Sequence, residues 1–460
     1  MRCATNNFAS GPRIRALQSW LLHRKILLFA IAAFLPVLQA QNPTYRFITN
    51  LGNVDVTLTP NAAPKTVANF LSYLNAGYYN NVVFHRSVAN FIVQGGQYQY
   101  FPGQTPNLVA IPTSPAIQNE FNVSNTAGTI AMALVSGNAN SATSQWFFNV
   151  VDNSGQLDSQ SFTVFGSTNA AGLAVLKRIN ALPTVDESAV YGDSGLTTFP
   201  VSNSNPIVVS SIVPIPVFTA GGFESAASFA SSSTTGISPG EVLTIFGSGL
   251  GPSQLTTLTI DSNGVVTKSL AGTQVTFNGT PAPVIYTSAN QISVVAPYSI
   301  STLPVVSIAV SYNGVAAGNT LSFNVKAANP AIFTLNSSGS GDGVIVRYQG
   351  AGYSVISASN PASAGDVLTL FGEGYGVPTS STAIPDGTIV TSTLPIPAAS
   401  SALMIDGQNV NTSYFGGAPF EINGVLQVNF TVPQLTPGAH QIQLMVAGRT
   451  SPMGVTLQTK

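Results

Sequence analysis

The stretch of sequence that decides the fold runs from residue 84 to residue 96 and reads FHRSVANFIVQGG. Three shorter segments follow it in order: GTIAMA at 128–133, SQWFF at 144–148 and FTVFG at 162–166. All four belong to a block of about 43–213 that mixes short strands with two helical patterns. This block is the first of three that follow the N-terminal region.

Local patterns near the ends of this block predict its elements. Residues 45–49 and 54–58 alternate apolar and polar side chains around a turn at 50–53, which is typical of a β-hairpin. The stretch 63–71 opens with a proline and places apolar residues at helical spacing, and a second helix is expected over 170–181. With several short strands between them, these elements predict an antiparallel barrel capped by two helices.

The rest of the chain contains an internal repeat. Residues 239–251, PGEVLTIFGSGLG, match residues 364–376, AGDVLTLFGEGYG, at a constant offset of 125. Further on, 291–297 pairs with 427–433. Each copy consists of short alternating strands separated by Gly, Pro and Asn turns, without a long amphipathic helix, so the repeat predicts two β-sandwiches.

The glycines of the repeat allow a second interpretation as a Gly-rich nucleotide loop, but proline rather than a helix follows the first copy, so strand-end turns are favoured. Likewise, residues 261–264 begin like a calcium loop but lack its terminal Glu, so a hairpin turn is favoured there.

The first forty residues have the order of a secretory signal peptide. Five basic residues precede an apolar run at 26–38, and residues 38–40, LQA, offer a small-residue cleavage site. The apolar run is about a dozen residues long, whereas roughly 20 are needed to span a bilayer, so an uncleaved anchor is the weaker alternative. We therefore expect export to the periplasm, the cell surface or the medium, with no integral membrane span after processing.

Composition restricts the chemistry of the processed chain. Only 7% of the residues are charged, and removing five of the 15 Lys and Arg leaves ten against 16 Asp and Glu, a net charge of about −6. The one cysteine, Cys3, lies in the signal, and only His85 and His440 remain. These features argue against disulfides, thiol chemistry, a nucleic-acid surface, a His-based metal site and a Ser-His-Asp triad.

The four segments of the first block resemble the motifs of cyclophilin-type peptidyl-prolyl cis-trans isomerases. The family has Phe-His-Arg, then after four residues Phe, an apolar pair and Gln-Gly-Gly, and the later segments come in family order with family spacing apart from short indels. The resemblance covers about 170 residues. It implies a closed antiparallel β-barrel with two capping helices and an isomerase that acts on proline-containing polypeptides and assists the folding of exported proteins. It implies no metal and no cofactor.

The resemblance also assigns roles by position. Arg86 corresponds to the catalytic cation, Gln94 to a residue that binds a substrate carbonyl and helps to hold the arginine, and Gln145 to one that aligns the flanking peptide. The backbone around Ala133 and Leu134 shares that aligning role. The apolar slot for the proline ring corresponds to Phe91, Ile92, Phe147, Leu157 and Phe162.

Several positions depart from the best-known members. Ile92 stands where Met is common, Leu134 where Asn is found and Phe162 where His is often found. Gln156 replaces a Trp that shapes drug binding in many eukaryotic members, which puts strong cyclosporin binding in doubt. His85 is a packing residue in the family pattern, and a chemical role for it is the less favoured interpretation.

The C-terminal copies resemble immunoglobulin-like sandwiches of the transcription-factor and plexin type, and a C-terminal module of unknown function on secreted bacterial proteins. The expected fold is mainly β, with a signal peptide at 1–40, the barrel at 43–213, a linker at 214–222 and sandwiches at 223–330 and 331–460. Two functions stay open: isomerisation, or a secreted or cell-surface peptide-binding or adhesion protein with little turnover. A contact of the sandwiches with the envelope or with polysaccharide also stays open.

Overall fold

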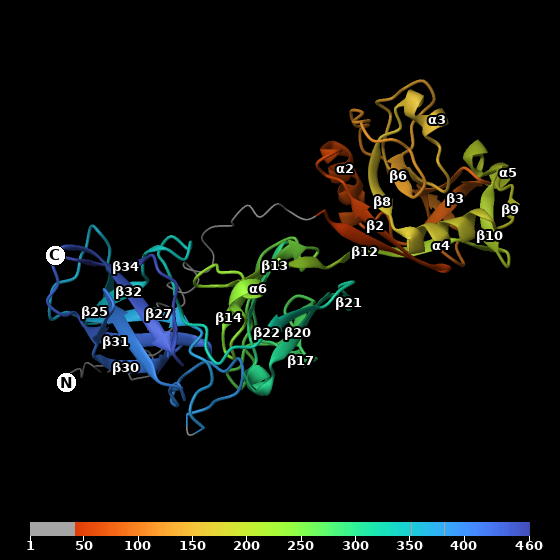
Figure 1. The fold of residues 1–460 in the computed structure, drawn as a ribbon. Helices are drawn as coiled ribbons and strands as arrows, with labels where there is room; N and C mark the ends of the chain where they lie inside the picture. The colour runs from red at the N-terminus through yellow and green to blue at the C-terminus, as the bar shows by residue number, and fades with distance from the viewer. Residues whose placement is uncertain (1–41, 351, 381) are drawn as a thin grey trace, which may run out of the picture. The chain divides into compact units, whose positions relative to one another are not determined.

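The computed structural model describes residues 42–460 except 351 and 381, and these form two compact units (Figure 1). The first spans Gln41–Ile215 and the second contains Pro216–Lys460. The signal peptide expected at 1–40 lies outside the described residues. Within the part of the chain that is described, no helix has the length and apolar character needed to cross a membrane.

The first unit is a closed antiparallel barrel, as predicted, and the barrel has eight strands. The strands follow the order β3-β12-β1-β2-β8-β6-β7-β4, and β4 pairs with β3 to close the barrel, while β5 extends from β4. Their bounds are β1 Thr44–Thr49, β2 Gly52–Leu58, β3 Val82–Val88, β4 Ile92–Tyr100, β5 Leu108–Ala110, β6 Thr129–Met132, β7 Trp146–Asn149, β8 Val164–Thr168 and β12 Val208–Ile215.

The two predicted helices are confirmed as α2, Pro64–Asn75, and α4, Ala170–Asn180. Both bury an apolar face in the barrel core, α2 through Val67 and Phe70 and α4 through Leu176 and Ile179. The core itself is aromatic: Phe47 lies edge-to-face with Trp146 and Phe148 at ring distances of 5.3 and 5.5 Å. This packing fixes the strands that carry the candidate site.

The first unit also contains short elements that were not predicted. They are α3 Ser154–Leu157, the 3₁₀ turn η1 Asp158–Gln160, β9 Thr184–Val185, α5 Ser188–Tyr191, the 3₁₀ turn η2 Ser194–Leu196, β10 Phe199–Ser202 and β11 Asn205–Pro206. The strands β9, β10 and β11 form a small separate sheet. Leu196 and Phe199 pack with Tyr98 in an apolar cluster of their own.

The segment 214–222, expected to be a linker, is instead β-structure on both sides of Pro216. It contains the end of β12 and most of β13, Val217–Ser225. Strand β13 forms here because Phe218 and Phe223 both point into the core of the first sandwich. Their side chains are buried, and their rings lie 5.6 Å apart. The prediction failed because these two aromatic residues were not recognised as core positions.

The second unit contains two pairs of sheets. The first pair has the strand orders β13-β14-β19-β18-β15 and β17-β16-β20-β21, with β22 paired to β20. One apolar core contains Leu243 and Ile245 from the first sheet and Val275, Phe277 and Ile308 from the second, so the two sheets form a sandwich. The bounds are β14 Val242–Ser248, β15 Thr256–Thr257, β16 Thr273–Phe277, β17 Thr280–Pro281, β18 Val284–Thr287, β19 Gln291–Val295, β20 Val305–Tyr312, β21 Val315–Ala316 and β22 Leu321–Asn324; α6 Ser232–Thr235 and η3 Tyr298–Thr302 are short helical turns.

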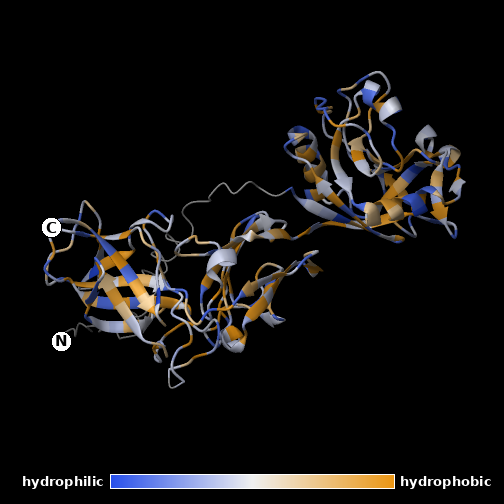
Figure 2. Ribbon diagram, viewed as in Figure 1, coloured by the Kyte–Doolittle hydropathy of each residue, from blue (hydrophilic) through white to orange (hydrophobic). Residues whose placement is uncertain are grey.

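The second pair repeats this plan, with apolar residues concentrated along its strands (Figure 2). The orders are β26-β25-β27-β31-β30, with β23 on β27, and β24-β34-β32-β28-β29, with β33 on β32. The bounds are β23 Ala331–Ile332, β24 Gly341–Asp342, β25 Ile345–Gln349, β26 Gly352–Val355, β27 Val367–Glu373, β28 Ser401–Ile405, β29 Gln408–Val410, β30 Thr412–Gly417, β31 Val425–Thr431, β32 Gly438–Val446, β33 Arg449–Thr450 and β34 Val455–Thr459. The repeated segments are β14 and β27, which pair with β19 and β31. A relation of these sandwiches to the immunoglobulin type stays a prediction.

Candidate active site

The candidate site begins with a row of paired residues on four neighbouring strands. Arg86 of β3 lies opposite Gln94 of β4, Gln94 lies opposite Phe147 of β7, and Phe147 lies opposite Ala131 of β6. Directly paired residues project to the same face of a sheet. The sheet therefore places a guanidinium, an amide and a phenyl ring side by side.

Hydrogen bonds connect the polar members of this row. Arg86 Nη1 donates to Gln94 Oε1 at 3.3 Å, and Gln94 Nε2 donates to Gln145 Oε1 at 2.8 Å. This orientation leaves most of the Arg86 donors available, because a guanidinium carries five N–H groups. The three polar residues expected from the sequence are thus adjacent.

The Arg86 guanidinium is partly buried, and no carboxylate of the described residues forms an ion pair with it. The ion pairs among residues 42–460, apart from the two undescribed positions, join Arg46 to Asp55, Arg347 to Asp366 and His440 to Asp406. Burial lowers the pKa of Arg86 from its ordinary value, although the group stays charged at any pH at which the protein folds. A cation with unused donors is suited to a substrate atom that develops a lone pair.

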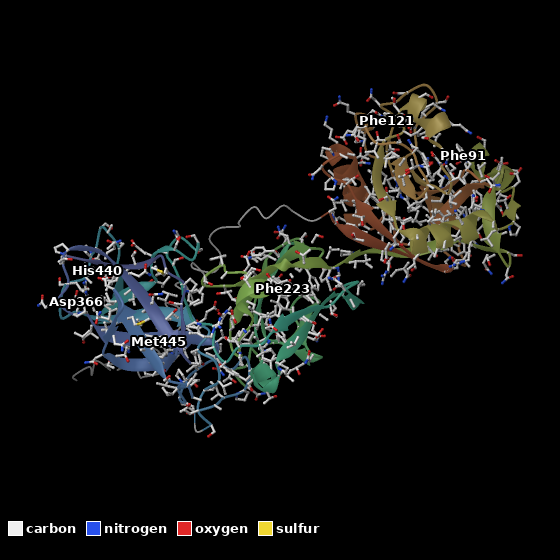
Figure 3. The ribbon with its side chains drawn as sticks, in the orientation of Figure 1. Phe91, Phe121, Phe223, Asp366, His440 and Met445 are labelled. Carbon is white, nitrogen blue, oxygen red and sulfur yellow. The ribbon has the colours of Figure 1, made fainter. Side chains whose placement is uncertain are left out.

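The residues assigned to the slot lie in an apolar cluster that is separate from the barrel core and that includes Val88 of β3, the strand that carries Arg86. The buried members of the cluster are Ile92, Ala131, Phe147, Leu157 and Val164, and the partly buried Val88, Phe91, Ala133 and Phe162 pack against them. The rings of Phe147 and Phe162 meet edge-to-face at 5.4 Å. Figure 3 labels Phe91, one wall of the slot.

The structure thus brings together every residue that the resemblance assigned to the slot. The Ala133 N–H donates to Gln145 O at 3.0 Å, which ties the peptide-aligning segment to the strand beside it. Leu134 differs, because its side chain packs against the barrel core and not against the slot. Its assigned role concerned the backbone, which stays a prediction.

His85 is a buried neighbour of the site. It is 1% exposed, and its ring lies edge-to-face against Tyr98 at 6.1 Å. Burial lowers the pKa of His85 to about 4, against the opposing effect of the Asp193 charge, so the ring is neutral at pH 7. These contacts fit the packing role that the sequence favoured.

Several asparagines that support the slot were not predicted. Asn153 Nδ2 donates to Phe91 O at 2.9 Å, Asn125 Nδ2 to Phe162 O at 3.0 Å, and Asn119 Nδ2 to Ser161 O at 2.6 Å. Each amide therefore holds the backbone of a loop that carries a slot residue or its neighbour. Asparagine in a loop signals a turn, but no local pattern indicates which distant carbonyl it will bind.

Nothing in this site resembles a metal centre or an acid–base pair. Among the described residues, no group of three or more His, Cys, Asp or Glu side chains could hold a metal ion. What the arrangement offers is an oriented cation, an amide chain and an apolar slot. It can bind an extended peptide with a small apolar ring and place a hydrogen-bond donor beside it.

This combination of barrel, row and slot corresponds to a known family. Residues 44–198 match the family described as cyclophilin type peptidyl-prolyl cis-trans isomerase/CLD. The chain is 36% identical to peptidyl-prolyl cis-trans isomerase A of Dickeya dadantii, covering 83% of that protein, and 38% identical to peptidyl-prolyl cis-trans isomerase B of Escherichia coli, covering 84% of it. A relative from Acinetobacter baylyi is 40% identical, with 71% of its length covered. The chain belongs to the cyclophilin-type peptidyl-prolyl cis-trans isomerase family.

The matches to these relatives involve 30–35% of this chain. They therefore describe the barrel. The two sandwiches of the second unit make up most of the remaining length and have to be understood from their own residues.

Proposed function

We propose that this protein catalyses cis–trans isomerisation of X–Pro peptide bonds in exported polypeptides, with Arg86 as the catalytic residue. The observation that carries the proposal is the partly buried Arg86 guanidinium, which has no carboxylate partner among the described residues and lies beside a slot built from Phe91, Ile92, Phe147, Leu157 and Phe162. The proline ring would occupy this slot, and Gln94 and Gln145 would bind the flanking peptide.

The chemistry follows from the peptide bond itself. Rotation crosses a barrier of roughly 18–20 kcal/mol because the C–N bond is partly double, and the two X–Pro isomers differ by only about 1 kcal/mol. In the twisted transition state the prolyl nitrogen regains a basic lone pair. A hydrogen bond from Arg86 stabilises this state more than either planar state, so it accelerates both directions. Lowering the barrier by about 7 kcal/mol would give a roughly 10⁵-fold acceleration.

A protease-coupled assay on a short X–Pro peptide tests the proposal. The chain without residues 1–40 should accelerate the cis-to-trans step, and Arg86→Ala should lower kcat/KM by about 10²- to 10³-fold, as expected for loss of a single transition-state donor. Arg178→Ala is the matched control. Arg178 lies on α4, and its Nη2 donates to Leu51 O at 3.0 Å, so its loss should leave kcat/KM unchanged.

The competing function is peptide binding with little turnover. It predicts that the unaltered chain binds the X–Pro peptide, for example in a calorimetric titration, but does not accelerate isomerisation above background. That result would replace the isomerase proposal. Equal activity of wild type and Arg86→Ala would remove Arg86 from the mechanism while leaving the activity itself in place.

Export is part of the proposal because of the basic, apolar and small-residue order of the first forty residues. Expression of the complete chain in a bacterial host should yield a processed protein that begins near residue 41 outside the cytoplasm. N-terminal sequencing of the periplasmic and extracellular fractions tests this. An unprocessed cytoplasmic protein would contradict it.

We further propose that the second sandwich contacts polysaccharide. A groove of about 800 Å³ lies between the β28–β29 hairpin and the ends of β30 and β31, and its lining includes Asp406, Gln408, Asn409, Asn411, Thr412, Ser413 and Gln434. Amide and hydroxyl groups match the donors and acceptors of sugars. Retention of the protein on insoluble envelope polysaccharide, reduced by Asn409→Ala with Asn411→Ala, would support this contact. Retention that the double substitution leaves unchanged would contradict it.

A further inference from the structure

One side chain at the end of helix α4 binds the turn between the two strands that carry the site. This turn, residues 89–91, joins β3 to β4, and α4 ends at Asn180. The Asn180 Oδ1 accepts a hydrogen bond from the Asn90 N–H at 2.9 Å. Its Nδ2 has two N–H groups, which are shared among three acceptor oxygens: Ser87 Oγ at 3.0 Å, Val88 O at 2.9 Å and Ile92 O at 3.2 Å.

The turn combines its own hydrogen bond with support from outside. Asn90 has a φ of 53°, in the left-handed region that asparagine adopts more readily than most residues other than glycine. Inside the turn, the Phe91 N–H donates to Val88 O at 3.1 Å. Asn153 binds the turn from a second side through Phe91 O. The amide of Asn180 is thus the group that holds both strand ends and the turn between them.

These strand ends carry the working parts of the site. Arg86 lies two residues before Val88, and Gln94 lies two residues after Ile92. The one side-chain hydrogen bond of Arg86 among the described residues goes to Gln94 at 3.3 Å, so the backbone of the hairpin largely determines where the guanidinium lies. Phe91 and Ile92, which follow the turn, form a wall of the slot.

We propose that Asn180 is a positioning residue of the isomerase site. Its amide fixes the turn at residues 89–91 and thereby the separation between the Arg86 guanidinium and the wall formed by Phe91 and Ile92. This inference rests on the proposed function. Because the guanidinium acts on the prolyl nitrogen mainly in the twisted transition state, a shift of this separation lowers kcat more than it raises KM.

Asn180→Asp tests the inference with little change of shape. The variant keeps an oxygen for the Asn90 N–H but replaces the donating NH₂ with an acceptor that faces the oxygens of Val88 and Ile92. We expect kcat to fall about tenfold or more, since misplacement by about 1 Å can reduce a rate 100-fold, while KM changes less than about twofold. If Asn180→Asp does not fold, Asn180→Ser provides the same test, because its smaller side chain lacks the amide.

The matched control lies at the other end of the same helix. Asn169 is the N-cap of α4, and its Oδ1 accepts from the Gly172 N–H at 3.0 Å. Asn169→Ala should lower the Tm by a few degrees, as the loss of a cap does, and leave kcat unchanged. Hydrogen–deuterium exchange of residues 86–94 should quicken in Asn180→Asp and stay at the wild-type rate in Asn169→Ala.

The outcomes separate the inference from the function on which it rests. An active wild type with an unchanged kcat in Asn180→Asp, or an equal loss of kcat in Asn169→Ala, overturns the positioning role alone. A wild type without acceleration overturns the proposed function. In that case the exchange rates still decide whether Asn180 fixes the turn, because equal rates in wild type and Asn180→Asp would show that it does not.

Discussion

The barrel and the sandwich pair bury polar side chains of different kinds. Around the peptide site, beside Arg86 and His85, several of the buried or partly buried polar groups are amides, such as those of Gln94, Gln145, Asn153 and Asn180. In the second unit they are carboxyls: Glu241 and Glu373 are 0% exposed and Glu421 is 8% exposed. Amides do not titrate and carboxyls do. The amide contacts of the site therefore do not titrate, whereas the buried carboxyls make the stability of the sandwich pair depend on pH.

Glu373 shows what a buried carboxyl does in the second unit. It lies at the end of β27 in the second repeat copy, but it accepts hydrogen bonds from the first copy: from Ser225 Oγ at 2.6 Å, the Ala227 N–H at 3.0 Å and the Val242 N–H at 2.8 Å. Burial raises its pKa. Glu373 therefore connects the two sandwiches.

Glu241 lies in the same buried region. Its carboxyl accepts from the Ser238 N–H at 2.7 Å and from Asn329 Nδ2 at 2.8 Å. Burial raises the pKa of Glu241, and the charge of Glu373 raises it further. Burial and the charge of Glu373 therefore disfavour the state in which both carboxyls are ionised.

The largest expected effect comes from removing this connection. Glu373→Ala leaves three buried donors without an acceptor and should lower the free energy of unfolding of the second unit by about 3–5 kcal/mol. Denaturant unfolding of the chain without residues 1–40 measures it, with far-UV circular dichroism for the whole protein. Trp146, the only tryptophan outside the first forty residues, reports the barrel by fluorescence and should not respond.

The repeat provides a matched control for Glu373→Ala. Ser248 occupies the corresponding position of the first copy, 125 residues earlier, and its buried Oγ has no hydrogen-bond partner among the described residues. Ser248→Ala should therefore change stability by less than about 0.5 kcal/mol. If the two substitutions lowered the free energy of unfolding equally, the hydrogen bonds that Glu373 makes and Ser248 does not make would contribute nothing to stability.

This asymmetry marks a limit of what the sequence could predict. The repeat follows from the match between two segments, and the hairpin at 45–49 and 54–58 and both long helices follow from local periodicity; the structure confirms all of them. Glu241 and Asp366 are equivalent in the repeat, yet Glu241 is fully buried, while Asp366 is partly exposed, is paired with Arg347 and is labelled in Figure 3. Which copy buries its carboxyl is decided by packing between the sandwiches, which local sequence does not contain.

The sequence predicted the residues of the candidate site better than the residues that hold the surrounding loops. Arg86, Gln94 and Phe147 lie in motifs with characteristic spacing, so a resemblance could assign them. Asn180 acts across about ninety residues of sequence on the turn at 89–91, and nothing near it in the sequence indicates that contact. The sequence therefore assigned the residues expected to contact the substrate, and Gln94 as a support of Arg86, but not the asparagines that bind the neighbouring loops.

A second prediction concerns pH and the sandwich pair. Burial raises the pKa of Glu421 to about 8 from 4.5, so the folded state binds this proton more tightly than the unfolded state does. The stability present below about pH 4.5 is therefore lost as the pH rises towards 8. Glu421→Gln should make the second unit more stable than wild type by about 2–4 kcal/mol at pH 8. A difference that is as large at pH 4.5 as at pH 8 would contradict this cause.

The barrel should respond to pH in the opposite direction and somewhat more weakly. Burial lowers the pKa of His85 to about 4 from 6.5, so here the unfolded state binds the proton more tightly. Stability present above pH 6.5 is lost as the pH falls towards 4. His85→Phe keeps a ring against Tyr98 and should remove about 1–3 kcal/mol of this acid-induced loss, measured by Trp146 fluorescence during unfolding at pH 7 and 4.5. A variant that loses as much stability as wild type would rule out His85 as the source.

The smallest effect is expected where the two regions are alike. Arg46 binds Asp55 in the barrel through Nε at 2.7 Å and Nη2 at 2.8 Å, and both side chains are 28% exposed. Such a pair contributes about 0.2–1 kcal/mol, and salt screens it because the Debye length falls to about 3 Å at 1 M. Arg46→Gln should therefore cost less than about 1 kcal/mol in 20 mM salt and still less in 1 M salt, and Arg347→Gln should behave similarly in the second unit. A loss of unfolding free energy above about 2 kcal/mol in either variant, unchanged by salt, would contradict this prediction. It would show that these partly exposed ion pairs also contribute strongly to stability.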